Sequence, residues 1–470
     1  MISIDALSDD VLHEIFDHYM YDVRLEEGSQ EVERAWQSLV HVCHRWRSIV
    51  FESPRGLDLF LVCTGRTPTR DMLDVWPTLP LIIDVDSGRE IGSVDNIIAA
   101  LERTDRVCQI GIVYTKSSDL EILLAAMQQP FPELTKLFLW SIDETIVVPD
   151  SFLDGSAPRL ELFSLNRITF PGLPKLLLSA THLVTLQLFN IPHSGYFPPD
   201  AIVTVLSTLT SLNSFELEFL SPQSCPDLSS RRSLPLTRFV LPVLTRFEFK
   251  GDGEYLEDLV ARIDAPQLNF LQITFFNDIV FDTPQLIRFL TQTPKLKALQ
   301  KAVINLMDHA VRVNFSSQTS LSRGGGHLMV EISCNLDWQL SSLEQVCTSC
   351  LPLLSMLEDL CFQTNPQVDW KDNIDNEPWL ELFRPFSAVK NLYLSYEGVS
   401  RVAPALQELV EGRATEVLST VLPTLQNIFV EGLELSGPVQ EGIGQFVAAR
   451  QVAGHPIAVS RWTREKDRFY

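Results

Sequence analysis

One short apolar pattern recurs along most of this chain and constrains its fold more than any other feature. In the pattern LxxLxL, the first apolar residue enters a short segment and the next two alternate along it, as side chains alternate along a β-strand. The first seven copies start 23 to 32 residues apart. They are Val107/Ile110/Ile112, Leu134/Leu137/Leu139, Leu160/Phe163/Leu165, Leu183/Leu186/Leu188, Leu212/Phe215/Leu217, Leu244/Phe247/Phe249 and Leu268/Leu271/Ile273, and the later copies are Val389/Leu392/Leu394 and Leu425/Ile428/Val430. A period of this length predicts an array of repeated units.

The segments between these copies indicate helices. A proline often precedes a copy and marks a corner between helix and strand, at Pro132, Pro158, Pro242, Pro266, Pro294 and Pro423. Apolar residues then recur at helical spacing in three segments, Leu120/Leu123/Leu124/Met127, Leu256/Leu259/Val260/Ile263 and Leu286/Phe289/Leu290. Strand, helix and strand in one direction predict an α/β solenoid with a parallel sheet, similar to leucine-rich repeats. The array is irregular: apolar residues replace the usual Asn ladder, and the register blurs between about 296 and 386.

Composition limits the classes of function. The chain of 470 residues carries 60 acidic and 37 basic side chains, for a net charge of −23. Because phosphate binding needs concentrated positive charge, nucleic acid and membrane are not expected partners. The acidic start is unlike a secretory signal, and no apolar run approaches the roughly 18 residues that span a bilayer. Eight scattered cysteines suit a reducing compartment, so an intracellular protein, cytoplasmic or nuclear, is expected.

The first 55 residues have a different pattern from the repeats. Five apolar residues at helical spacing predict one amphipathic helix, with Asp9 and Asp10 in its first turn. A polar insertion over 22–33 is followed by a second predicted helix that carries Trp36, Leu39, Val40, Cys43, Trp46 and Val50. Leaving the five apolar side chains of the first helix in water would lose roughly 8 to 15 kcal/mol of the hydrophobic free energy that their burial provides. A covering partner is therefore expected, either the repeats or another protein.

Two segments of this head resemble a known family. LSDDVLHEIF (7–16) and LVHVCHRWRSIV (39–50) are similar to the F-box, whose usual pattern is Leu-Pro-x-Glu-hydrophobic-Leu-x-x-Ile-Phe and later Leu-x-x-Val-Cys-x-x-Trp. The combination with irregular repeats resembles F-box proteins that are numerous in basidiomycete fungi. Ser8 stands where the family usually has Pro. The resemblance gives three domains: an F-box-like helical domain (1–55), a leucine-rich-repeat-like solenoid (56–440) and a C-terminal cap or tail (441–470).

The resemblance implies a non-catalytic substrate receptor of a ubiquitin ligase. An F-box docks on the Skp-type adaptor of a cullin-RING ligase, while the repeats hold a protein substrate. Carried over by position, the adaptor-binding candidates are Leu7, Ser8, Val11, Leu12, Ile15, Phe16, Leu39, Val42, Cys43 and Trp46. Two alternatives stay open. The same residues form only the private core of a helical domain, or the protein is a repeat scaffold whose F-box is degenerate and has no ligase role.

Four clusters have the residue types of metal or phosphate sites but lack the spacing that such sites require. They are the CTSC pair Cys347 and Cys350, the group His41, Cys43 and His44, the segment 84–95, and Gly324 to Gly326 before His327. For these we predict core packing, the inside of a helix, a solvated turn and a flexible loop, because the ligand spacing or the GK[ST] residues are missing. We expect no catalytic residue, metal or cofactor. An enzyme would need a pocket with convergent polar groups, for which the region of His327 is the best candidate.

The strands themselves predict a binding surface. Residues between the inward apolar positions point to the opposite, concave face of the sheet, and concave solenoid faces bind partners. The substrate-binding candidates on this face are Phe138, Trp140, Phe189, Arg246 and Phe270. The alternative is that helices, loops or the C-terminal tail cover them.

Overall fold

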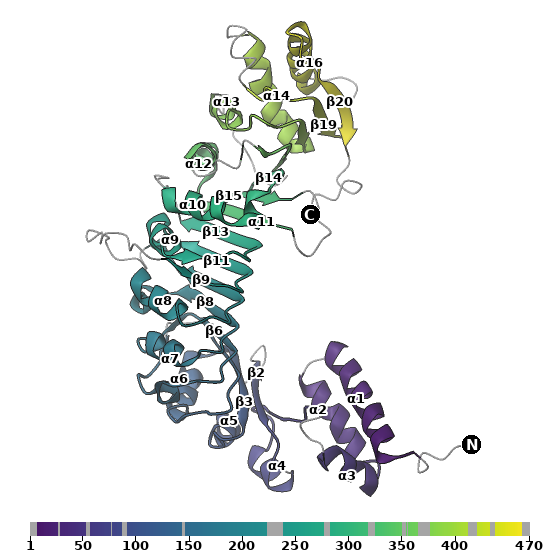
Figure 1. Ribbon diagram of the computed structural model, residues 1–470, viewed down its shortest axis with the longest axis vertical. Helices are drawn as coiled ribbons and strands as arrows, with labels where there is room; N and C mark the ends of the chain where they lie inside the picture. The colour runs from purple at the N-terminus through teal and green to yellow at the C-terminus, as the bar shows by residue number, and fades with distance from the viewer. Residues whose placement is uncertain are drawn as a thin grey trace. The chain divides into compact units, whose positions relative to one another are not determined.

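The computed structural model describes residues 7–26, 29–52, 57–76, 78–86, 92–142, 146–222, 238–276, 283–317, 325–349, 354, 356–364, 377–411, 421–432 and 438–462. The chain divides into two compact units, Met1–Tyr196 and Phe197–Tyr470. Each is mixed α/β with mostly parallel strands (Figure 1), so the predicted α/β class is confirmed. The domain boundaries predicted at 55 and 440 stay predictions. Among the described residues, no helix has both the length and the apolar content to cross a membrane.

The first unit begins with three helices and continues with alternating strands and helices. The three helices are α1 (Asp9–Glu26), α2 (Ser29–Val40) and α3 (His44–Glu52). The strands are β1 (Leu61–Cys63), β2 (Leu81–Asp86), β3 (Val107–Thr115), β4 (Lys136–Ser141), β5 (Ile146–Val147), β6 (Leu162–Asn166), β7 (Ile168–Thr169) and β8 (Thr185–Ile191). Between them lie α4 (Thr69–Val75), α5 (Val94–Leu101), α6 (Ser117–Ala126), α7 (Leu173–Ser179) and the 3₁₀ helices η2 (Phe152–Gly155) and η3 (His193–Gly195).

The main sheet of this unit is parallel throughout. Its strand order is β1-β2-β3-β4-β6-β8, and β5 and β7 form a separate parallel pair. Helices α5, α6 and α7 lie on one side of the strands, and none of these three covers the other side, which we call the open face (Figure 1). The LxxLxL residues of β3, β4, β6 and β8 are buried on the helix side. The pattern therefore predicted these four strands and their inward faces.

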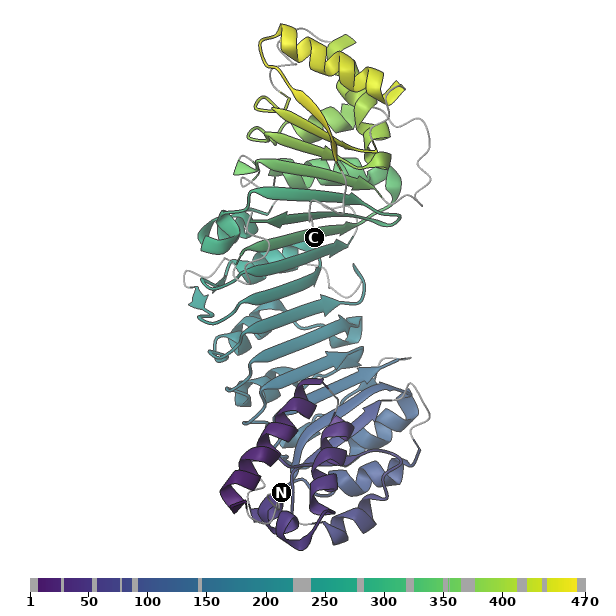
Figure 2. The ribbon, with the colours of Figure 1, turned by 90° about the vertical axis from the view of Figure 1, so that its right-hand side faces the viewer.

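The second unit repeats this plan over more strands. Its strands are β9 (Ser214–Phe219), β10 (Phe239–Val240), β11 (Arg246–Gly251), β12 (Ile263–Asp264), β13 (Phe270–Phe276), β14 (Lys301–Leu306), β15 (Ala310–Ser316), β16 (His327–Ser333), β17 (Asp359–Thr364), β18 (Asn391–Leu394), β19 (Asn427–Glu431) and β20 (Ala458–Trp462). Its helices are α8 (Pro199–Leu206), α9 (Gly253–Val260), α10 (Pro284–Gln292), α11 (Pro294–Lys297), α12 (Leu336–Ser349), α13 (Glu377–Phe383), α14 (Tyr396–Glu411) and α16 (Pro438–Val452). Figure 2 shows the open face of these strands with α8 and α9 behind them.

An antiparallel insertion is the reason that the sequence register blurs. The order of this sheet is β9-β11-β13-β16-β15-β14-β17-β18-β19-β20, and β15 runs antiparallel to both β14 and β16. The chain thus leaves β13, skips two strand positions in the sheet to form β14, and comes back through β15 to β16, which lies beside β13. In the described residues of this meander, no helix lies between its strands, so the repeat period is lost there. It resumes at β17, where Leu357, Leu360 and Phe362 are buried in the same pattern.

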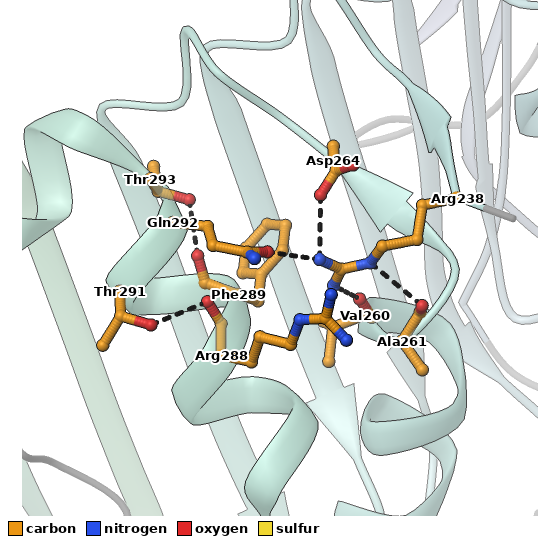
Figure 3. Close-up of polar contacts among 9 residues, drawn as sticks. All are labelled: Arg238, Val260, Ala261, Asp264, Arg288, Phe289, Thr291, Gln292 and Thr293. Atoms are coloured by element: carbon orange, nitrogen blue, oxygen red, sulfur yellow. Dashed lines mark hydrogen bonds and ion pairs between the residues drawn. The ribbon is translucent and has the colours of Figure 1, made fainter. Parts of the chain in front are cut away.

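A largely buried arginine connects elements on the helix side of the second unit. Arg238 precedes the short strand β10 and reaches the end of α9, where it donates to the carbonyls of Val260 (2.6 Å) and Ala261 (3.0 Å). It also pairs with Asp264 at 2.9 Å and donates to Gln292 on α10 (Figure 3). Burial lowers the pKa of Arg238, and Asp264 opposes this shift. One guanidinium therefore satisfies carbonyl groups that a helix end leaves without partners.

Candidate functional site

Helix α1 has two apolar faces with different surroundings. Leu12, Phe16 and Met20 are completely buried, and the ring of Phe16 packs on Trp46 of α3 with centroids 4.7 Å apart. Val11, Ile15 and Tyr19 recur every four residues on another face and are 41%, 48% and 43% exposed. One face therefore builds the core of the three helices, and the other is an apolar stripe open to a partner.

The start of α1 is fixed by a serine cap and an arginine. The hydroxyl of Ser8 accepts the backbone N–H of Val11 at 3.4 Å, which makes Ser8 the N-cap. Arg45 of α3 pairs with Asp9 at 2.6 Å and donates to the carbonyl of Leu7 at 2.5 Å. Ser8 thus has a structural reason to stand where the F-box pattern has Pro.

Replacing Ser8 by Ala is expected to lower the free energy of unfolding by about 1 kcal/mol, because the N–H of Val11 loses its acceptor. Chemical denaturation followed by circular dichroism measures the loss. Ser38→Ala is the matched control, since its hydroxyl bonds the Arg34 carbonyl within α2, and we expect a change of less than about 0.5 kcal/mol there. Equal effects in both proteins would contradict the capping role.

The ten predicted adaptor-binding residues differ in their exposure to solvent. Ser8, Val11, Ile15, Val42 and Cys43 are exposed, Leu7 and Trp46 are half-buried, and Leu12, Phe16 and Leu39 are buried. The predicted second helix is in fact two helices, with a break at 41–43. Arg47 of α3 donates to the last carbonyl of α2, that of Val40, at 3.1 Å, which stabilises the reversal. The predicted polar insertion is also mostly helical, because α1 continues to Glu26.

Helix α2 joins the three helices to the first strand. Trp36 is completely buried, its indole N–H donates to the carbonyl of Phe60 at 3.0 Å, and its ring packs edge-on against Trp76. Glu33, one turn earlier, accepts a hydrogen bond from the backbone of Val62 in β1. Burial raises the pKa of Glu33 to about 7, while the Val62 N–H and Arg34 act in the opposite direction. The same surroundings raise the pKa of Cys63 to about 12, chiefly through burial and then through Glu33.

In the first unit, the open sheet face carries an aromatic row. Trp140 lies between Tyr114 and Phe189, with centroids 5.6 and 6.3 Å away and rings nearly perpendicular. Its indole N–H donates to Ser164 at 3.0 Å, and Phe138 is half-buried on the same strand. The structure therefore brings Trp140 and Phe189 together, as predicted for this face.

Tyr114 was not predicted as part of this row. It is an extra residue at a register shift in β3, and its φ of 51° is unusual for an aromatic residue. A bulge of this kind re-aims a side chain, here toward Trp140. No residue type in the sequence marks the position, because a left-handed bulge ordinarily indicates Gly or Asn.

In the second unit, the open face carries a stack of three different side chains. Arg246, Phe270 and His327 are neighbours in register on β11, β13 and β16. The Arg246 guanidinium lies 4.1 Å from the centre of the Phe270 ring, and that ring stacks on His327 at 5.2 Å with an angle of 14°. Burial and the nearby Arg246 lower the pKa of His327. Two of the predicted substrate-binding residues, Arg246 and Phe270, therefore contact each other, and His327 joins them.

Three carboxylates lie on the same face, on β9 and β11. Glu216 and Glu248 are neighbours across β9 and β11 and are both buried. Arg246 is 3.9 Å from Glu216 and contacts Glu248 directly. Burial, and next the charge of Glu216, raises the pKa of Glu248. Burial also raises the pKa of Glu218, where Lys250 acts in the opposite direction.

The structure describes only part of the clusters considered for metal or phosphate binding. In the described ranges, no three His, Cys, Asp or Glu side chains are grouped to hold a metal ion. Cys347 is buried in α12, in line with core packing. Its predicted companion Cys350, Gly324 and part of the segment 84–95 (87–91) lie outside the described residues.

Two kinds of surface result from this geometry: the apolar stripe on α1, and the aromatic and charged rows of the open sheet faces. Both are arrangements that bind macromolecules, by burial of rings and by pairing of charges. No protein-family model matches this chain, and no curated protein matches it. The function is therefore inferred from these surfaces.

Proposed function

We propose that the chain is the substrate-recognition subunit of an intracellular ubiquitin ligase of the Skp-cullin-F-box type. Helices α1 to α3 act as an F-box-like head that binds the Skp-type adaptor. The strand and helix repeats act as a leucine-rich-repeat-like solenoid whose open face binds a protein substrate. Other subunits carry out the ubiquitin transfer, so this chain supplies no catalytic residue.

The observation that carries the proposal is the stripe of Val11, Ile15 and Tyr19. These residues lie on the helix that matches the F-box pattern, and their side chains are not used in the core. Val42, in the second matched segment, is also exposed. Burying the exposed parts of the three α1 side chains in a partner would contribute about 2 to 4 kcal/mol. An apolar helix face of this kind suits docking on another protein.

Ile15→Asp is expected to weaken binding to the Skp-type adaptor of the same organism at least about tenfold, because it places a charge in an apolar interface. The measurement is co-purification, followed by titration of the purified adaptor. Ile122→Asp is the matched control, since Ile122 is 50% exposed on α6 and away from the matched segments. Absence of binding by the folded wild type, or an equal loss in both variants, would contradict the proposal.

A second candidate is a repeat scaffold with no ligase role, and one observation favours it. Leu12 and Phe16 are buried within the chain, and α2 is fixed to β1 through Trp36. These contacts would be explained by a helical head whose only role is to cap the first strand. The adaptor titration separates the two candidates, because a scaffold would not bind the adaptor.

A further inference from the structure

The open face of the second unit carries a surface with charge and aromatic character side by side. We define the acidic-aromatic surface by Glu216, Glu218, Glu248, Arg246, Phe270 and His327. It lies on β9, β11, β13 and β16, which are neighbours in the sheet. We propose that this surface binds a basic segment of a partner protein, with the aliphatic stem of a Lys or Arg side chain along the exposed edges of the Phe270 and His327 rings and its charge toward the carboxylates. The inference rests on the proposed function in taking that partner to be the substrate.

The first argument is charge. On the described residues of β9, β11 and β13, the open face has three carboxylates and two cations, Arg246 and Lys250. The single positive charge of Arg246 is shared between the carboxylates of Glu216 and Glu248. Crowding of these acids contributes to the raised pKa values of Glu218 and Glu248, so an added cation would stabilise their charged forms. The net charge of −23 favours the approach of a basic partner as well.

The second argument is the aromatic platform. Phe270 and His327 are half-buried and stack nearly parallel, which presents two rings on the same face as the carboxylates. Arg246 lies over the Phe270 ring from β11 and His327 stacks on it from β16, so a partner side chain reaches the exposed ring edges and lays its aliphatic stem there. Burial and Arg246 lower the pKa of His327, which disfavours the charged imidazolium that would repel a cation.

The third argument is that the chain already makes the proposed contact. The Arg246 guanidinium lies over Phe270 at 4.1 Å and contacts the Glu248 carboxylate at the same time. A basic side chain from a partner would add a second cation to the same carboxylates, with its stem against the ring edges, because Arg246 already occupies one face of Phe270. Acidic and neutral segments would lack the cation that the combination requires.

The test uses the full-length chain and fluorescein-labelled peptides of glycine and serine with a substituted residue at every second position. The basic peptide carries Lys and Arg there, the neutral peptide Gln and the acidic peptide Glu. Fluorescence anisotropy at low salt is expected to show the basic peptide binding at least about tenfold tighter than the neutral one, with affinity that falls as salt rises. Equal affinity for the basic and neutral peptides, or a preference for the acidic one, would overturn the proposal.

Variants locate the binding. Glu218→Gln and Phe270→Ala are each expected to weaken the basic peptide several-fold, and the pair about tenfold or more. Trp338→Ala, at an exposed position on α12, is expected to leave this affinity unchanged. Circular dichroism establishes that each variant is folded. Unchanged affinity in folded Glu218→Gln and Phe270→Ala would also overturn the assignment.

The outcome is separable from that of the adaptor experiment. Ile15→Asp changes only α1, so it is expected to keep the peptide affinity of wild type. Peptide binding without adaptor binding would retain the acidic-aromatic surface and reject the ligase role. Adaptor binding without peptide binding would retain the ligase role and reject the surface.

Discussion

Trp36→Ala is expected to lower the free energy of unfolding by about 3 to 5 kcal/mol, the range for truncating a buried aromatic side chain. The Trp36 ring is completely buried on α2, with Trp76 at 5.2 Å and Phe51 at 6.1 Å between centroids. Its removal leaves a cavity and takes the donor from the carbonyl of Phe60, just before β1. Chemical denaturation followed by far-ultraviolet circular dichroism measures the loss.

Trp338→Ala provides the comparison for this result. Trp338 is 55% exposed on α12, so the same substitution there is expected to cost less than about 0.5 kcal/mol. A loss at Trp36 as small as that at Trp338 would contradict the packing of α2 onto the first strand. A large loss would establish that the three helices and the first strands unfold as one cooperative unit.

The strands of this fold could be predicted because their physical signal is local. Each LxxLxL copy combines strand alternation with one extra apolar residue that enters the core. All residues of the copies identified in the sequence are buried, and the last two of each copy lie in a strand. The helices α6, α9 and α10 were predicted in the same way from one apolar stripe each. Ile263, which was included in the stripe of α9, belongs instead to the short strand β12.

Features that depend on distant contacts could not be predicted. The antiparallel β15 is an alternating apolar segment like its neighbours, and its direction follows only from its pairing with β14 and β16. The break between α2 and α3 depends on the contact of Arg47 with Val40. Pro294 begins the short helix α11 rather than a corner before a strand, because proline is also well suited to a first helical turn.

The candidate sites show the same division. The sequence predicted which face of each strand is open, and so found Trp140, Phe189, Arg246 and Phe270. It did not find Tyr114 or His327 as their partners, since one needs a backbone bulge and the other a strand that returns beside β13. In α1, helical spacing identified the apolar residues but did not separate the buried face of Leu12 and Phe16 from the exposed face of Ile15.

Glu33→Gln is expected to stabilise the protein above about pH 7 and to have little effect at about pH 4.5 or below. Burial raises the pKa of Glu33 from 4.5 to about 7, so the folded state binds this proton more tightly than the unfolded state. The contribution of Glu33 to stability is therefore greatest below about pH 4.5, falls as the pH rises to about 7, and is constant above that. Gln stays neutral and still offers an oxygen to the Val62 N–H, so it removes the cost of ionisation.

The size of this effect follows from the shift. The full difference would correspond to about 3 kcal/mol, and solvent screening of this partly exposed carboxylate reduces the expected gain to about 2 kcal/mol. Chemical denaturation of both proteins at about pH 8 and about pH 4 measures it, with Glu14→Gln on the exposed face of α1 as the control, where we expect little change at either pH. A gain that is equal at both pH values would show that Glu33 acts through packing. A gain confined to the higher pH would place an ionisable group at the contact between α2 and β1, so the attachment of the three helices to the sheet would tighten as the pH falls below neutrality.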